Sequence, residues 1–205
     1  MLLRIHHLTP DPRQLKKVVE ILRDGGVIIY PTDGVYAFGC DITKNRAVER
    51  VAKLKGIKVE KADFSFVFDD LASLTEYSRP VDTPVFKLMK SCLPGPYTFI
   101  LNANNSVPKL FKNNKRTIGI RIPNHEICRA LVRELGNPII SSSVHDEDDL
   151  VEYTTDPELI HERYRDLVEI VIDGGYGALV PSTIIDCTGS MPELIRQGAG
   201  EVDLD

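Results

Sequence analysis

The feature that most constrains the fold of this chain is the stretch from Gly26 to Asp41, where an apolar run stops at a proline. The run Val27 to Tyr30 is β-branched and bounded by Gly26 and Pro31, which predicts a buried strand. Proline has no backbone N–H, so we expect the strand to end there and the chain to turn through residues 32–34. Open α/β sheets bind ligands where strands end in polar loops, so this turn is either an ordinary exit from a strand or part of a site.

Helix and strand patterns alternate along the rest of the chain, but several strands follow one another without a helix. Helices are expected from 12 to the stop at Gly25, at 44–55, from 83 to the turn that begins at Cys92, from 124 to 135 and from 157 to about 165, with Asp11, Thr83 and Asn124 as N-caps. Strands are expected at 2–5, 27–30, 64–68, 98–101, 117–122, 138–140, 168–172 and 182–186. This order predicts a twisted, mixed α/β sheet with flanking helices.

Composition limits the class of protein. The chain has 205 residues, of which 42% are hydrophobic, and no linker-like segment divides it, so we expect a single domain over residues 1–205. The four cysteines are scattered without a C-x-x-C pair, which argues against a disulfide framework or a zinc site and for a reducing compartment. No signal peptide and no run of 18 apolar residues is present, so we expect a soluble, cytoplasmic protein with no membrane association.

The charge pattern bears on nucleic-acid binding. A net charge of −5 disfavours RNA binding by the surface as a whole, so RNA contact would need a local basic face. Two clusters are candidates for such a face, and each is otherwise a set of ordinary solvated lysines. They are Lys53, Lys55, Lys58 and Lys61, and Lys109, Lys112, Lys115 and Arg116.

The common nucleotide and hydrolase motifs are absent: there is no G-x-G-x-x-G, P-loop, H-E-x-x-H or nucleophile elbow. Polar side chains instead gather near expected strand ends. They are the hydroxyls of Thr32, Ser141, Ser143, Ser182 and Thr183, with Lys55, Arg121 and Arg196. These groups suit a ligand that carries a carboxylate and phosphates, and would act by positioning and charge stabilisation. For Arg121 the alternative is an ordinary surface residue at a strand end.

Several motifs together resemble one family. Residues 30–41 resemble the Y-P-T-D-T-x-Y-G-L-G-C-D signature of the YrdC/YciO family. Residues 93–98 are similar to its P-G-P-x-T turn, 119–123 to its V-R-x-P strand, 182–186 to its S-T-[VI]-[VI]-D segment, and 195–199 to its closing I-R-x-G. The matches follow the family's order across nearly the whole chain, and the residues of these motifs resemble the YciO branch most.

The resemblance implies a YrdC/RibB-like fold, a twisted sheet with a concave groove. In the YrdC members this groove holds ATP, threonine and bicarbonate with Mg²⁺, and forms threonylcarbamoyl-AMP with release of pyrophosphate, for N6-threonylcarbamoyladenosine modification of tRNA. The family is also described as binding double-stranded RNA. Mg²⁺ would come with ATP, and no residue is predicted as a metal ligand.

Carried over by motif, Lys55 and Arg121 would be the catalytic residues. Thr32, Tyr36, Ser141 and Ser143 would bind substrate, and Lys55, Ser143, Ser182, Thr183 and Arg196 would bind the nucleotide.

The chain departs from the synthase pattern at three positions. Ile57 stands where the K-x-R motif has its arginine, His145 stands where S-x-N has its asparagine, and Gly34 replaces the second threonine of the signature. Two functions therefore stay open: a nucleotidyltransferase of the synthase type, or a protein that binds double-stranded RNA or tRNA and has lost the reaction. A third, metal-dependent chemistry, would use the run from His145 to Asp149, which is otherwise a solvated loop.

Overall fold

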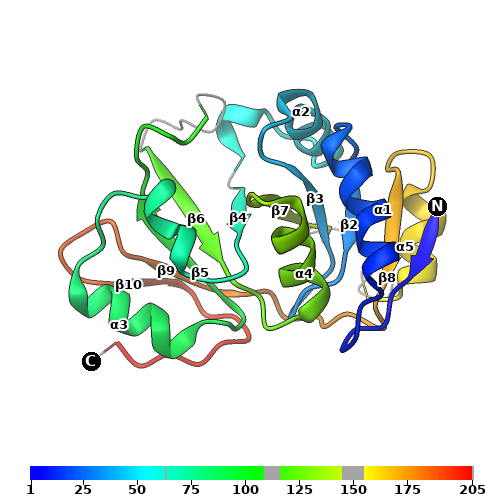
Figure 1. The fold of residues 1–205 in the computed structure, drawn as a ribbon. Helices are drawn as coiled ribbons and strands as arrows, with labels where there is room; N and C mark the ends of the chain where they lie inside the picture. The colour runs from blue at the N-terminus through cyan, green and yellow to red at the C-terminus, as the bar shows by residue number, and fades with distance from the viewer. Residues whose placement is uncertain (63, 109–115, 145–154, 205) are drawn as a thin grey trace.

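The computed structural model of the chain describes residues 1–62, 64–108, 116–144 and 155–204. Within these residues, ten strands form one sheet in the order β1-β8-β2-β3-β7-β4-β6-β5-β9-β10. The strands are β1 (Leu2–Arg4), β2 (Ile28–Tyr30), β3 (Ala37–Asp41), β4 (Ser65–Val67), β5 (Tyr97–Asn102), β6 (Thr117–Arg121), β7 (Ile139–Ser143), β8 (Ile170–Asp173), β9 (Thr183–Asp186) and β10 (Glu193–Arg196). The N-terminus and the C-terminus lie at opposite ends of this sheet (Figure 1).

The sheet contains both parallel and antiparallel pairs, as the sequence pattern predicts. Strands β1, β8 and β2 are parallel, and β3 runs antiparallel to both of its neighbours, β2 and β7. Strand β4 is antiparallel to β7 and parallel to β6, while β5 is antiparallel to β6 and parallel to β9. The predicted mixed α/β sheet is therefore confirmed.

Five α-helices and two 3₁₀ segments of the described residues pack on the two sides of the sheet. They are α1 (Pro12–Arg23), α2 (Asn45–Leu54), α3 (Thr83–Cys92), α4 (Glu126–Leu135), α5 (Pro157–Tyr164), η1 (Val59–Lys61) and η2 (Ala72–Glu76). Helices α1 and α4 lie side by side against one side of the sheet (Figure 1), with Val18, Leu22 and Leu131 fully buried beneath them. Across the described residues, no helix has both the length and the apolar character that a membrane crossing requires.

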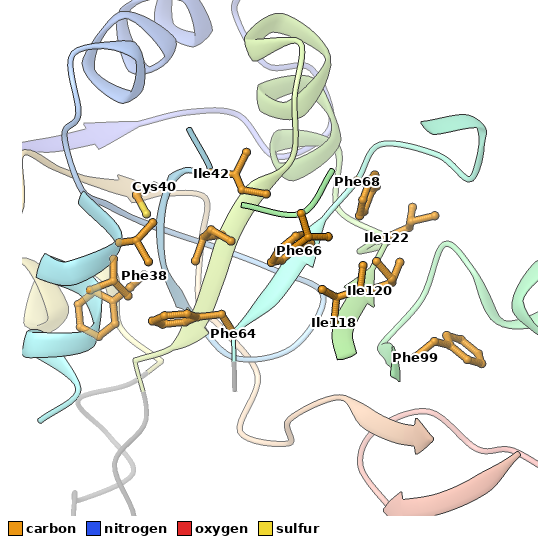
Figure 2. Close-up of a cluster of buried hydrophobic side chains, with 14 of the residues drawn as sticks. Phe38, Cys40, Ile42, Phe64, Phe66, Phe68, Phe99, Ile118, Ile120 and Ile122 are labelled. Carbon is orange, nitrogen blue, oxygen red and sulfur yellow. The ribbon is translucent and has the colours of Figure 1, made fainter. Parts of the chain in front are cut away.

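The larger core lies on the other side of the sheet, because successive side chains of each strand point to opposite sides. Strand β6 turns Ile118 and Ile120 into this core and leaves Gly119 and Arg121 on the α1/α4 side, as its sequence predicts. Figure 2 shows apolar side chains from β3, β4, β5, β6 and their flanks on this side. Helices α2, α3 and α5 contribute Val51, Met89 and Ile160 to the same core.

Three local predictions need correction. His125 takes the N-cap position of α4 in place of Asn124, whose N–H is donated to Asp33 instead. Asp82 precedes α3 in the cap position expected for Thr83. Neither β3 nor β10 was predicted as a strand: β3 is buried along its whole length, so its residues show no polar alternation, and β10 is exposed, so its pattern has no buried face.

Candidate active site

The side of the sheet that carries α1 and α4 continues past these helices as a surface of small and polar side chains. We define the open face as the side chains of β7, β4, β6, β5 and β9 on that side. A row of paired residues crosses it, since Gly39, Ser141, Ser65 and Gly119 are successive Cα partners on β3, β7, β4 and β6. Among the described residues, none from β5, β6, β9 or β10 enters the core beneath α1 and α4. This part of the sheet therefore carries small side chains on that side.

A buried ion pair joins the turn after β2 to the end of β6. Arg121 donates from Nη2 to Oδ1 of Asp33 at 3.1 Å, and the N–H of Asn124 is donated to Oδ2 of Asp33 at 2.7 Å. The side chains of Arg121 and Asp33 are only 9% and 8% exposed. Thr32 shapes the turn, because its hydroxyl donates to the carbonyl of Val35 and accepts from the N–H of Gly34. The signature turn and Arg121 thus form one unit at the edge of the open face.

A second guanidinium reaches the open face from the edge strand β10. Arg196 donates from Nη2 to the carbonyl oxygen of Ser182 at 2.8 Å. The Ser182 hydroxyl in turn lies 2.8 Å from the Thr98 hydroxyl of β5. Burial lowers the pKa of Arg196, and the positive charge of Arg121 lowers it further. Two like charges therefore share one face, which is an arrangement that an anionic ligand stabilises.

Two predicted ligand residues point to the other side of the sheet. The Thr183 hydroxyl donates to the carbonyl of Gly200 at 2.5 Å and accepts from the N–H of Gly198 at 2.9 Å. The Tyr36 hydroxyl donates to the carbonyl of Gly175 at 2.7 Å and accepts from the N–H of Gly174 at 3.3 Å. Both hydroxyls hold neighbouring loops, and their roles in ligand binding stay predictions.

Tyr36→Phe should lower the melting temperature by about 2–4 °C, because a net hydrogen-bond contribution of about 1 kcal/mol is lost. Differential scanning calorimetry of the two proteins measures this shift. An unchanged melting temperature with weaker ligand binding would instead indicate that the hydroxyl serves the ligand.

The remaining predicted residues lie on different elements. Ser143 is half-buried on the same side of β7 as Ser141. Lys55 is the C-cap of α2, whose apolar side packs in the larger core, and the nearby Ile57 side chain is 40% exposed. Three lysines of the second basic cluster (109, 112 and 115) and the run 145–149 lie outside the described residues.

The structure adds residues that the sequence reasoning did not assign to a site. Asp33 is the partner of Arg121, Thr98 is the partner of Ser182, and Ser65 and Gly119 lie in the row across the floor. Asp33 could have been found, since an acid in a signature turn suggests a fixed partner. The Thr98–Ser182 contact depends on the parallel pairing of β5 with β9, which has no local sequence signal.

A separate cavity of about 470 Å³ opens at the ends of β1 and β8. Its lining includes His6, Gly175 and Asp173, whose Oδ2 accepts from Nε of Arg4 at 2.8 Å. None of the predicted ligand residues lines this cavity. The predicted residues that lie on the open face are therefore separate from this cavity.

Comparisons with known proteins identify the family and the fold. The family model Sua5/YciO/YrdC, described as telomere recombination, matches residues 20–198. The uncharacterised protein YciO of Escherichia coli K12 is 40% identical over 200 residues, which are 97% of this chain and 95% of that protein. The crystal structure of E. coli YciO matches with a TM-score of 0.90 at 39% identity, over 98% of this chain and 97% of that chain.

Two further relatives have more specific names. A protein named threonylcarbamoyl-AMP synthase from Nitrosococcus oceani is 33% identical over 132 residues, which are 64% of this chain and 71% of that protein. The structure of P. abyssi Sua5 complexed with L-threonine has a TM-score of 0.86 at 24% identity, over 97% of this chain and 57% of that one, a likeness that shows the fold. With a family model over residues 20–198 and a 40% identical relative along nearly its whole length, the chain belongs to the Sua5/YciO/YrdC family.

Proposed function

We propose that this protein is a nucleotidyltransferase of the threonylcarbamoyl-AMP synthase type that binds ATP, L-threonine and bicarbonate on the open face. Relatives named threonylcarbamoyl-AMP synthase at 30–33% identity support this class of reaction. The L-threonine complex of P. abyssi Sua5, a protein of the same fold, supports threonine as the amino acid. The product would then supply the N6-threonylcarbamoyl group of tRNA adenosine.

The observation that carries the proposal is the shared face of Arg121 and Arg196. Each guanidinium is held by a neighbouring strand or turn, and the charge of one lowers the pKa of the other. Asp33 already balances the charge of Arg121, and a ligand set with several negative oxygens, such as ATP together with a carboxylate, supplies acceptors to both guanidinium groups.

The reaction needs little from the protein beyond position and charge. The amine of L-threonine attacks bicarbonate and water leaves, which gives a carbamate. A carbamate oxygen then attacks the α-phosphorus of ATP and pyrophosphate leaves, so negative charge moves onto the phosphate oxygens. Fixed guanidinium and hydroxyl donors stabilise such charge without reorganisation. We assign Arg196 and Ser182 to the nucleotide, and Arg121 with the Thr32 turn to the amino-acid end.

Mg²⁺ is proposed to arrive with ATP. Magnesium in nucleotide sites keeps water ligands and binds substrate phosphates, so it does not require a cage of protein side chains. Among the described residues there is no group of three His, Cys, Asp or Glu side chains that could hold a metal ion. The arrangement is compatible with a metal coordinated mainly by the triphosphate.

The decisive experiment measures pyrophosphate release from ATP with L-threonine, bicarbonate and Mg²⁺, beside an Ile57→Arg variant. We expect release that requires both L-threonine and bicarbonate, and a faster rate in the variant, because an exposed arginine restores a bidentate phosphate donor. Omission of L-threonine or of bicarbonate is the control. A folded protein that releases no pyrophosphate in either form would contradict the proposal.

The second candidate is a protein that binds RNA and has lost the reaction. The observation in its favour is Ile57, an exposed apolar residue where the synthases have an arginine. Binding to a double-stranded RNA would then weaken steeply as salt rises, because phosphate contacts release counterions. Pyrophosphate release in the Ile57→Arg variant but not in the natural protein, together with salt-sensitive RNA binding, would favour this candidate.

A further inference from the structure

The cavity at the ends of β1 and β8 is the second place in the fold where a ligand can be held. It lies where parallel strands end, because β8 pairs in parallel with both β1 and β2. Ligands of α/β sheets commonly bind outside the carboxyl ends of parallel strands. The cavity volume of about 470 Å³ is within the range of small-molecule sites. Position and size therefore both suit a small ligand.

Three segments line the cavity, and hydrogen bonds hold each of them in place. They are residues 4–7 at the end of β1, residues 173–176 at the end of β8 and residues 156–158 at the start of α5. Asp173 accepts from Nε of Arg4 at 2.8 Å and from the N–H of Gly175 at 3.0 Å, which ties the first two segments together. Asp156 caps α5 by accepting from the N–H of Glu158 at 2.8 Å. The cavity is therefore formed before any ligand arrives.

Two glycines keep one wall of the cavity free of side chains. A Cβ on Gly174 would come within 2.7 Å of Cγ of Pro31, so this segment packs closely on the end of β2. Gly175 has a φ of +99°, a conformation that favours glycine. The Tyr36 hydroxyl bonds to the N–H of Gly174 and to the carbonyl of Gly175, which fixes both peptides. A ligand can therefore approach the backbone here.

The charged groups of the cavity favour a ligand without negative charge. Among the described residues, its lining carries the carboxylates of Asp156, Asp173 and Glu158 and the guanidinium of Arg4. Arg4 and Asp173 balance each other as an ion pair at 2.8 Å, which leaves the other two carboxylates in excess. Nη2 of Arg4 lies 4.0 Å from Oε1 of Glu158, and both side chains are more than two-thirds exposed, so this second pair is weak. A phosphate would meet like charge here, whereas a hydroxyl group can donate to the exposed Glu158 carboxylate.

Flat side chains give the cavity surfaces on which a planar ring can stack. The rings of His6 and His7 are exposed and stack on each other, with centroids 5.2 Å apart and planes 16° apart. Tyr176 is 81% exposed, so most of its ring is open to a ligand. A nucleobase stacks on such rings whatever its sequence of donors and acceptors. The lining therefore suits a planar heterocycle.

We propose that this cavity binds a nucleoside: the base stacks on the ring of Tyr176, and the ribose hydroxyls donate to the carboxylate of Glu158. Carboxylates hold ribose hydroxyls in the same way in dinucleotide sites. A nucleoside joins a flat ring to a diol and carries no phosphate, so it matches the rings, the carboxylates and the charge of the cavity together. The inference does not rest on the proposed function, because none of the described residues that line the cavity belongs to the open face.

The first test measures adenosine binding to the full chain by isothermal titration calorimetry. Tyr176→Ala should weaken binding at least about 10-fold, because the stacking surface is lost. Leu179→Ala is the matched control, since Leu179 is exposed in the same connection between β8 and β9 but is not among the residues that line the cavity. It should leave the affinity for adenosine unchanged.

The second test examines the carboxylate. Glu158→Gln should weaken adenosine binding about 10-fold, because a charge-assisted hydrogen bond is lost. Glu162→Gln, at an exposed position one turn further along α5 and outside the lining, should not weaken it. 2′-Deoxyadenosine should bind the natural protein about 10-fold more weakly than adenosine, and Glu158→Gln should reduce this difference, because the hydroxyl and the carboxylate are partners.

The outcomes decide between the nucleoside and the alternatives. Absence of adenosine binding by the folded natural protein, or equal losses in Tyr176→Ala and Leu179→Ala, would overturn the inference. Spermidine binding that Glu158→Gln weakens, without adenosine binding, would show an amine site and overturn it as well. Adenosine binding that Arg196→Met weakens and Tyr176→Ala does not would place the nucleoside on the open face, against this inference. Adenosine binding that depends on Tyr176 and Glu158 would support the inference even if no pyrophosphate is released, a result that contradicts the proposed function alone.

Discussion

Arg121→Met is expected to lower the free energy of unfolding by about 3–5 kcal/mol, because it leaves the buried carboxylate of Asp33 without its cation. Both side chains are less than a tenth exposed, so water cannot replace the lost partner. The same change should reduce the rate of pyrophosphate release at least about 100-fold, since a fixed donor to the substrate anion is removed. Urea unfolding and the pyrophosphate assay measure the two effects.

The controls for this change follow from the pair itself. The double variant Arg121→Met/Asp33→Asn should recover most of the lost stability without recovering turnover, because it removes the unpaired charge but not the missing donor. Arg165→Met breaks an ion pair whose side chains are 64% and 88% exposed, and should cost less than about 1 kcal/mol. Equal losses at Arg121 and Arg165 would contradict the assignment of a buried, essential pair.

Gly198→Ala should be the most damaging small substitution near the open face. A Cβ on Gly198 would meet the carbonyl oxygen of Pro181, and the carbonyl carbon and oxygen of Ser182 at 2.5 and 2.6 Å. These are backbone atoms that cannot rotate away, so we expect a loss of about 1–3 kcal/mol and a displacement of the segment that carries Arg196. Turnover should fall more than about 10-fold, because the Arg196 to Ser182 contact lies beside the clash.

Gly189→Ala is the matched control for this prediction. A Cβ on Gly189 has its nearest neighbour at 3.8 Å, the carbonyl oxygen of Met191, which is an ordinary contact. We expect it to change stability by less than about 0.5 kcal/mol. Urea unfolding and turnover of both variants give the comparison, and similar results for the two glycines would refute the steric argument.

Local sequence patterns predicted most of the elements correctly because their causes are local. The first helix begins at Pro12 after Asp11, whose carboxylate accepts from the N–H of Arg13 at 2.8 Å. The alternation along β6 placed its isoleucines in the core and Arg121 on the other side. In each case the decisive interactions lie within a few residues.

The contacts between residues of the candidate site could not be predicted from local sequence patterns. Arg121 and Asp33 are 88 residues apart, and Ser182 and Thr98 are 84 apart, so their meeting depends on the strand order of the whole sheet. The predicted cap at Asn124 was wrong because α4 begins one residue later, with His125 in the cap position. The resemblance placed Tyr36 and Thr183 among the ligand residues, and sequence alone did not show that both turn to the opposite side of the sheet.

The position of Arg196 on β10 has a consequence for biosynthesis. Strand β10 is the last strand of the sheet in chain order, and it pairs only with β9 at the sheet edge. A nascent chain can pair the central strands β2, β3, β7, β4 and β6 before residue 196 leaves the ribosome. A ribosome-bound chain that lacks β10 would therefore have a folded centre and one guanidinium on the open face, and would gain the second only after residue 196 has left the ribosome.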